Sequence, residues 1–70
     1  MVIATVRNFK QEVVYTSQAN SLGKVYYELH TEYPSDKFLL TLNEEGDRVF
    51  IDGRRGGGTL EAELTPVTFD

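Results

Sequence analysis

The chain has 70 residues, a net charge of −4 and no cysteine. Seventy residues make one small domain with a thin core, and they are too few to enclose a deep substrate cavity as well. The lack of cysteine excludes disulfides and thiolate-bound zinc, and the negative charge counts against a general binder of nucleic acid or of an anionic membrane, because both attract proteins through a positive field.

The rest of the composition is typical of a folded domain. Apolar residues make up 40% of the chain and aromatic residues 11%, which is more than a disordered tail carries. The N-terminal segment lacks the basic start and the sustained apolar run of a signal peptide, and no later stretch could span a bilayer. We therefore expect a cytoplasmic protein that has no membrane partner.

Two strands joined by a short turn are predicted at the N-terminus. Val2–Arg7 has apolar residues on both faces, which is typical of a central strand. Residues 12–16, EVVYT, are mostly β-branched or aromatic and are predicted to form the second strand. Residues 8–11 are a weak turn sequence, since they lack glycine and proline, but a connection this short can only join antiparallel neighbours.

One amphipathic helix is predicted within residues 20–34, NSLGKVYYELHTEYP. Here alone the apolar residues recur at helical spacing, and they form one buried stripe: Leu22, Val25, Tyr26, Leu29 and Tyr33. The candidate N-caps are small polar residues that accept hydrogen bonds from the first turn: Ser17, Asn20 and Ser21. Gly23 lies early in the helix, where we expect it to permit a close approach to the sheet. Pro34 ends the helix, because the residue before a proline is pushed out of the α region.

Three further strands are predicted after the helix. They cover residues 37–42, 48–52 and 59–65. The loop between the first two contains Gly46, which suits a left-handed position in a hairpin turn. Residues 53–58, GRRGGG, are rich in glycine, which loses much conformational entropy in regular structure, so a flexible loop is predicted there. Pro66 marks an edge or a bend, after which Val67 and Phe69 can continue the pairing.

The order of these elements predicts an α+β fold. We expect a single amphipathic helix packed on a mostly antiparallel four- to five-stranded sheet, in the order β-β-α-β-β-β, with a β-grasp-like arrangement as the leading topology. No internal repeat and no long linker divides the chain, so residues 1–70 are predicted to form a single small α+β domain.

A single helix can cover only one face of such a sheet. If the covered face holds the apolar residues Val49, Ile51, Leu60, Ala62 and Leu64, the other face is left open. Phe50 and Leu39 would then lie on the open face, with Ile3 or Val14, among Thr41, Glu61 and Glu63. The alternative is that residues 66–70 fold over this face and hide it.

Four residues are predicted to contact a partner: Tyr27, Phe50, Arg54 and Arg55. Tyr27 points away from the helix stripe and offers a rigid, amphipathic surface, although single exposed aromatics are also common. Arg54 and Arg55 lie in the glycine loop, where the backbone can approach a phosphate and two arginines can clamp it. That loop lacks the helix and lysine of a P-loop, so a mobile hairpin tip is the favoured interpretation.

No catalytic, cofactor or metal site is predicted. His30 borders the helix stripe, but no nucleophile stands at a recognisable spacing from it and no second histidine could share a metal with it. The carboxylates are scattered and are expected to form a solvated face. Arg7 and Arg48 are expected to lie opposite acidic residues of neighbouring strands, where each pair guides register more than it stabilises.

The sequence therefore favours a non-enzymatic module that binds another protein, or itself as a homodimer, through the open sheet face or an edge strand. The alternative is a nucleic-acid-binding protein that uses a basic group with a stacking tyrosine: Lys37, Arg48, Arg54 and Arg55. An enzyme or an enzyme subunit is the least favoured class.

The segment EVVYTSQANSLGKVYYELHTEYPSDKF resembles a pattern of small phage- and plasmid-encoded accessory proteins. The pattern is a strand, a small polar capping region, a short amphipathic helix that ends in Tyr-Pro, and another strand. The small host RNA-polymerase inhibitors of T7-like phages are similar in this order of elements. The resemblance implies a mobile-element-encoded modulator or inhibitor of a host protein, and this chain departs from it by carrying Gly23 and two adjacent tyrosines in the helix.

Overall fold

The chain folds into one helix on a five-stranded antiparallel sheet, as the sequence predicts. The computed structural model describes residues 1–56 and 58–67. The elements are β1 (Val2–Arg7), β2 (Val13–Ala19), α1 (Leu22–Glu32), β3 (Phe38–Leu42), β4 (Arg48–Gly53) and β5 (Thr59–Pro66). The predicted α+β class and the order of elements are confirmed.

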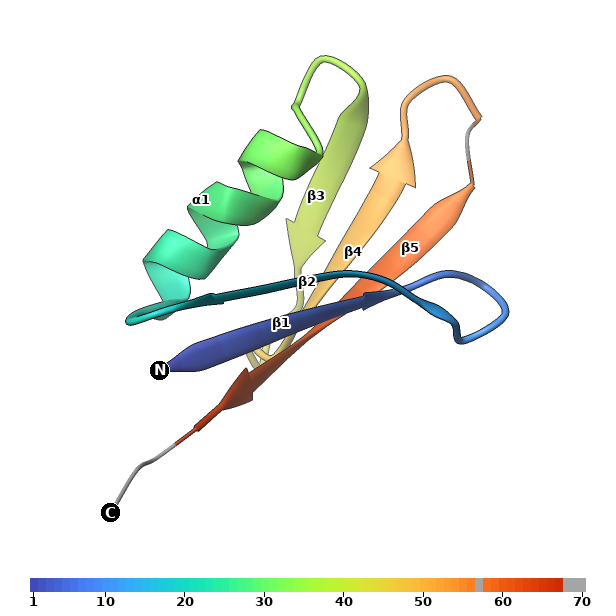
Figure 1. The fold of residues 1–70 in the computed structure, drawn as a ribbon. Helices are drawn as coiled ribbons and strands as arrows, with labels where there is room; N and C mark the ends of the chain where they lie inside the picture. The colour runs from blue at the N-terminus through green and yellow to red at the C-terminus, as the bar shows by residue number, and fades with distance from the viewer. Residues whose placement is uncertain (57, 68–70) are drawn as a thin grey trace.

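The sheet has the strand order β2-β1-β5-β4-β3, and every neighbouring pair is antiparallel. The first and last strands, β1 and β5, are therefore neighbours in the middle of the sheet, whereas β2 and β3 are its two edges. The helix connects these edges by crossing one face of the twisted sheet (Figure 1). The opposite face is not covered by any described helix.

The core lies between α1 and the sheet. Its buried side chains come from the helix and from four strands: Ala4, Val6, Val25, Leu29, Leu40, Val49, Ile51, Ala62 and Leu64. Val25 and Leu29 anchor the helix, and each such fully buried side chain contributes about 1.5–3 kcal/mol. The predicted inner face is thus confirmed, with Leu60 partly buried beside it.

Strand β2 is longer than predicted and ends at Ala19. Ser17 lies inside this strand opposite Ala4, so its prediction as a helix cap is wrong. Its hydroxyl instead donates to the Glu28 carboxylate of α1. Small side chains at Ser17 and Ala19 leave room for the helix above the strand, and pairing with β1 overrides their local preference for a cap.

The helix begins at Leu22, and Ser21 is its N-cap. The Ser21 Oγ accepts a hydrogen bond from the Lys24 N–H at 3.3 Å. The close approach expected at Gly23 does not occur, because no atom would lie within 4 Å of a Cβ added there. Leu22, predicted in the buried stripe, is 39% exposed, since it lies in the first turn, beyond the core.

The turns are fixed by asparagine side chains. The Asn8 Oδ1 accepts from the N–H groups of Lys10 and Glu12 at 2.9 and 3.0 Å, and Gln11 takes the left-handed conformation with φ of 67°. In the β3–β4 turn, Asn43 accepts from backbone N–H groups in the same way, and Gly46 has φ of 76°. The left-handed position predicted for Gly46 is confirmed.

The C-terminal end of β5 continues along β1. Pro66 lies opposite Val2, beyond the last pair that β5 forms with β4. The sheet therefore loses no hydrogen bond through the missing N–H of Pro66. The Val67 N–H donates to the Met1 carbonyl at 2.8 Å, which confirms that the pairing continues past the proline. Up to Val67 the chain thus runs beside β1 instead of folding over the open face, and the prediction for Phe69 lies outside the described residues.

Candidate functional site

The open face of the sheet presents four rows of side chains, one of which holds Leu39, Asp52 and Thr59 across β3, β4 and β5. The first row, across β3, β4, β5 and β1, holds Thr41, Phe50, Glu61 and Arg7. The second row, across β4, β5, β1 and β2, holds Arg48, Glu63, Thr5 and Thr16. The third row holds Thr65, Ile3 and Gln18. The predicted placement of Phe50 and Ile3 on the face away from the helix is therefore confirmed, as is that of Leu39, which lies one diagonal step from Phe50.

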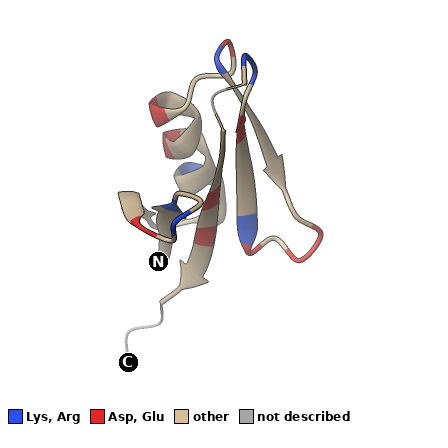
Figure 2. Ribbon diagram, turned by 90° about the vertical axis from the view of Figure 1, so that its right-hand side faces the viewer, with Lys and Arg blue, Asp and Glu red and all other residues tan. Residues whose placement is uncertain are grey.

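The apolar residues of this face form two groups that charged side chains separate. The first group is the half-buried Phe50 with the exposed Leu39. The second is Ile3, which lies two strands away from Phe50. Between them, the Arg48 Nη1 lies 3.5 Å from the Glu61 Oε2. Figure 2 shows acidic positions along the strand that leads to the C-terminus. Phe50 and Leu39 therefore form an apolar centre with a charged border, and we refer to Phe50, Leu39 and this border as the Phe50 patch.

Charges on this face are only partly balanced. Arg48 and Glu61 are each about two-fifths exposed, so their contact is worth at most about 1 kcal/mol. Arg7 lies opposite Glu61 in register, as expected, but its guanidinium donates to the Gln11 carbonyl at 3.1 Å. Glu63 forms no ion pair among the described residues. The border of the Phe50 patch is therefore acidic overall.

Tyr27 lies on the other side of the molecule from Phe50. Its side chain is 73% exposed on α1, on the side of the helix away from the buried Val25 and Leu29. The expectation that Tyr27 is exposed is confirmed. However, the helix and the sheet separate Tyr27 from Phe50, so one flat partner surface cannot contact both residues.

The glycine loop is tied to the turn that follows the helix. The Arg54 N–H donates to the Lys37 carbonyl at 2.9 Å, and the Arg54 Nε donates to the Ser35 carbonyl at 2.7 Å. Gly53, predicted in this loop, is the last residue of β4. These bonds make residues 53–56 a supported loop, in contrast to the free hairpin tip that the sequence favours.

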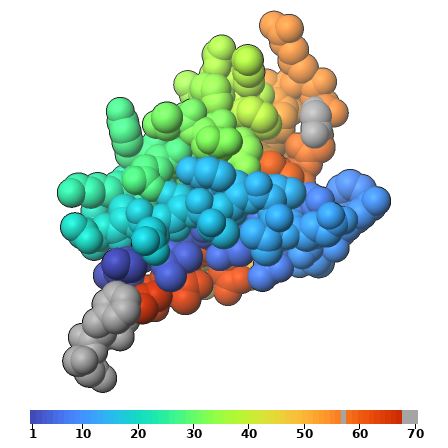
Figure 3. Space-filling view, viewed as in Figure 1, coloured from blue at the N-terminus to red at the C-terminus, as the bar shows by residue number. Residues whose placement is uncertain are grey.

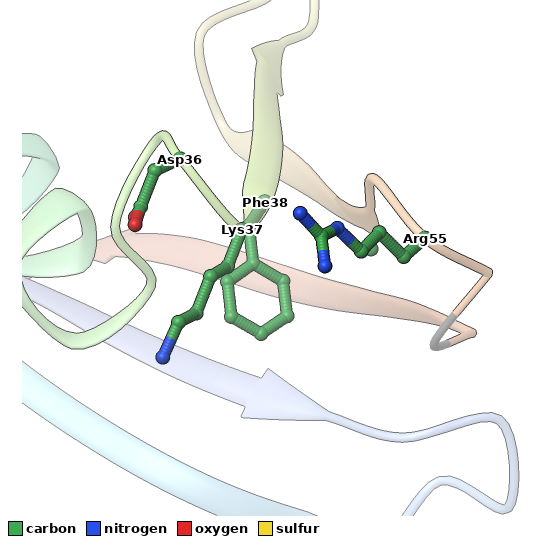
Figure 4. A pocket seen from close by; sticks show the side chains of 5 residues that line it. Asp36, Lys37, Phe38 and Arg55 are labelled. Carbon is green, nitrogen blue, oxygen red and sulfur yellow. The ribbon is translucent and has the colours of Figure 1, made fainter.

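A hollow of about 380 Å³ lies between this loop and the turn after the helix. Its lining includes the charged side chains of Asp36, Lys37 and Arg55, with Phe38 between them (Figure 4). Lys37, Arg54 and Arg55 thus gather at one end of an otherwise acidic protein. We refer to Lys37, Arg54 and Arg55 as the basic end.

An aromatic cluster closes the core near the basic end. The Tyr33 ring lies edge-on to Tyr15, with centroids 6.0 Å apart, and edge-on to Phe38, with centroids 5.2 Å apart. Burial raises the pKa of the Tyr33 phenol, and the Glu32 carboxylate raises it further. Tyr33 is therefore neutral at physiological pH and has a structural position. His30, edge-on to Tyr26 with centroids 4.8 Å apart, borders the core as predicted.

Phe9 is a candidate contact that the sequence analysis missed. It lies in the β1–β2 turn with 82% of its surface exposed, and the Lys10 Nζ is 5.7 Å from the ring centroid. An aromatic residue within a four-residue polar turn is the signal that could have found it. Val13 and Val14, at the start of β2, are also exposed, so this hairpin end is an apolar surface.

Within residues 1–56 and 58–67, no three potential metal-ligating side chains lie together, and no helix is long and apolar enough to cross a membrane. Comparison with models of known families, with curated proteins and with solved structures finds no match to this chain. The case for a function therefore depends on the surfaces described above.

Proposed function

We propose that this chain is a non-enzymatic module that binds another protein through the Phe50 half of its open face. The single observation that carries the proposal is the half-buried Phe50 ring on a sheet face that no described segment covers. Aromatic residues in such positions are the usual energetic centres of protein interfaces. The resemblance to mobile-element accessory proteins supports a modulator or inhibitor of a host protein as the biological role.

The border of the patch defines the chemistry of the partner. Three carboxylates, those of Asp52, Glu61 and Glu63, lie on this face around Phe50, and Arg48 is the basic side chain of the same strand. The Asp52 carboxylate already accepts from the Thr59 hydroxyl at 2.8 Å. The proposed occupant is a folded protein whose contact surface has an aliphatic centre with lysine or arginine at its rim, because these charges complement the acidic border.

A matched pair of substitutions tests this proposal. A tagged chain is used to isolate proteins from lysate of the source organism or its host, after nuclease treatment, and the captured protein is then purified and its affinity measured. Phe50→Asp is expected to weaken that binding at least tenfold, since it places a charge at the centre of the contact. Tyr27→Asp makes a comparable change on the far side of the molecule and is expected to leave the affinity unchanged.

Circular dichroism and thermal unfolding verify that both variants fold. Equal affinity of the Phe50→Asp variant and the unchanged chain would refute the proposed surface. A loss of affinity in Tyr27→Asp alone would move the binding site to the helix.

A second candidate function is supported by the basic end. Lys37, Arg55 and Phe38 line the hollow, and Arg54 is bonded to the Lys37 carbonyl beside it. Single-stranded nucleic acids bind such combinations of cations and an aromatic ring. The overall charge of −4 opposes it. Binding to a fluorescent single-stranded oligonucleotide is expected to fall as salt rises and to be lost in an Arg54→Gln/Arg55→Gln variant; salt-independent binding or none excludes this candidate.

A further inference from the structure

The two edges of the sheet differ in how their backbone groups are protected. Alternate residues of an antiparallel strand turn their N–H and C=O groups to the same side. Beside β3, the Lys37 carbonyl accepts from the Arg54 N–H, and the Asn43 N–H donates to the Arg48 carbonyl. The backbone N–H and C=O groups of odd-numbered residues therefore point toward β4. The residues that face away from the sheet are Phe38, Leu40 and Leu42.

The β3 edge is partly closed by its own chain. The Phe38 N–H donates to the Pro34 carbonyl at 2.9 Å, and the Leu40 carbonyl accepts from the Tyr26 hydroxyl at 3.4 Å. Tyr26 therefore reaches from the helix over the edge of β3. A second chain would have to displace these groups before it could pair here.

Within residues 1–56 and 58–67, no group covers the β2 edge in this way. The Met1 carbonyl accepts from the Val67 N–H, so odd-numbered residues of β1 face β5 and even-numbered residues face β2. In the register of β1 with β2, the backbone N–H and C=O groups of Tyr15, Ser17 and Ala19 therefore point toward β1. The residues whose backbone N–H and C=O groups point away from the sheet are Thr16 and Gln18, and Val14 lies at the register shift. Figure 3 shows this strand running uncovered across the near side of the molecule.

The sequence of β2 also lacks the usual protection of an edge. Edge strands in natural proteins carry lysine, proline or inward-pointing charges that prevent pairing with another chain. Residues Val13–Ala19, VVYTSQA, contain none of these. The register shift between Val6 and Arg7 affects only the start of the strand and leaves Tyr15–Ala19 regular.

We propose that this edge binds a second copy of the chain, so that β2 pairs antiparallel with its equivalent about a twofold axis at Thr16. In this register Thr16 lies opposite Thr16, and Tyr15 lies opposite Ser17. Each pair therefore joins two threonines or a large side chain with a smaller or polar one, and no like charges meet within the strand. A symmetric dimer needs such a self-complementary surface.

The position of Glu28 favours an axis at Thr16 over an axis at Ser17. The Glu28 carboxylate lies above Ser17, from which it accepts a hydrogen bond. An axis at Ser17 would bring both Glu28 side chains next to the axis, where their charges repel. An axis at Thr16 places Tyr15 opposite Ser17 and separates the two carboxylates.

In the dimer, the sheets of the two copies join into one continuous sheet. Both open faces lie on the same side of it, because the twofold axis is perpendicular to the sheet. Phe50 does not lie in β2, and the two surfaces are separated by β1 and β5. The dimer therefore does not depend on the protein-binding function proposed above. A substitution that breaks the dimer leaves the Phe50 patch intact, so failures of the two proposals are distinguishable.

The experiment measures mass by sedimentation velocity from about 1 µM to about 1 mM, a range that covers tight and weak dimers. The unchanged chain is expected to shift from 7.9 kDa toward twice that mass as its concentration rises. Thr16→Lys and Thr16→Glu are each expected to raise the dissociation constant at least tenfold, because like charges meet across the axis. An equimolar mixture of the two variants is expected to restore the dimer, since lysine then faces glutamate.

Thr41→Lys is the matched control, because Thr41 is also an exposed threonine on the open face of an edge strand, β3. It is expected to dimerise like the unchanged chain. A chain that stays at 7.9 kDa up to about 1 mM overturns the proposal, as does a Thr16→Lys variant that dimerises normally. If the mixture fails to associate while each variant is folded by circular dichroism, the Thr16 register is wrong.

Discussion

Replacing Gly23 by alanine is expected to stabilise this protein. Gly23 is the second residue of α1 and is exposed, and no atom lies within 4 Å of the Cβ that alanine would add. The substitution therefore creates no clash and removes conformational freedom from the unfolded chain only. Alanine is favoured over glycine by about 1 kcal/mol inside a helix, and the first turn realises part of this, so we expect a gain of about 0.5–1 kcal/mol.

This gain corresponds to a rise in Tm of about 2–8 °C for a domain of this size. Thermal unfolding followed by circular dichroism at 222 nm measures the shift, and urea unfolding provides the free energy independently. Gly46→Ala is the matched control, because a Cβ there also meets no atom within 4 Å but the residue has φ of 76°. Alanine resists that conformation, so Gly46→Ala is expected to lose about 1 kcal/mol.

The two substitutions thus differ in backbone conformation and not in available space. If Gly23→Ala lowers the free energy of unfolding, the helix start at Leu22 or the open space around Gly23 is wrong. If both variants change stability by the same amount in the same direction, the reasoning from φ is refuted.

Three other substitutions or titrations test the local structure. Gln11→Gly is expected to stabilise by about 0.5–1 kcal/mol, because glycine adopts φ of 67° without strain, and urea unfolding measures this. Ser21→Ala removes the acceptor for the Lys24 N–H and is expected to cost about 1 kcal/mol in the same assay. The Tyr33 phenol is expected to ionise above its ordinary pKa of 10.0, seen at 295 nm as a phenolate step that Tyr33→Phe removes. Because folding raises the pKa of Tyr33, the contribution of its neutral phenol to stability is fully present below pH 10.0. This contribution is lost as pH rises through the pKa of Tyr33 in the folded protein.

The periodic parts of the sequence were the most predictable. Val25 and Leu29 are buried, and Phe50 and Tyr27 lie on the sides that their spacing indicates, because a helix and a strand each fix which residues share a face. Pro34 ended the helix as expected, since α1 stops at Glu32. These outcomes depend on local geometry alone.

Features that depend on distant contacts were not predictable. The sequence offers Ser17 as one of three candidate caps, but its strand partner Ala4 lies more than ten residues away and determines its conformation. The glycine loop is held by bonds from Arg54 to Ser35 and Lys37, which no local composition reveals. The same holds for the edges of the sheet, because the protection of the β3 edge by Tyr26 appears only when the helix is placed above the sheet.

The pairing of β1 with β5 has a consequence for how the chain folds. The centre of the sheet joins residues from the two ends of the sequence, as in Val2 with Pro66. On a ribosome, the β1–β2 hairpin and the β3–β4 hairpin can form early, but neither has its central neighbour until β5 has been synthesised. The nascent protein must therefore hold two unfinished half-sheets with exposed inner edges, and a shortened chain would lose the strand that unites them.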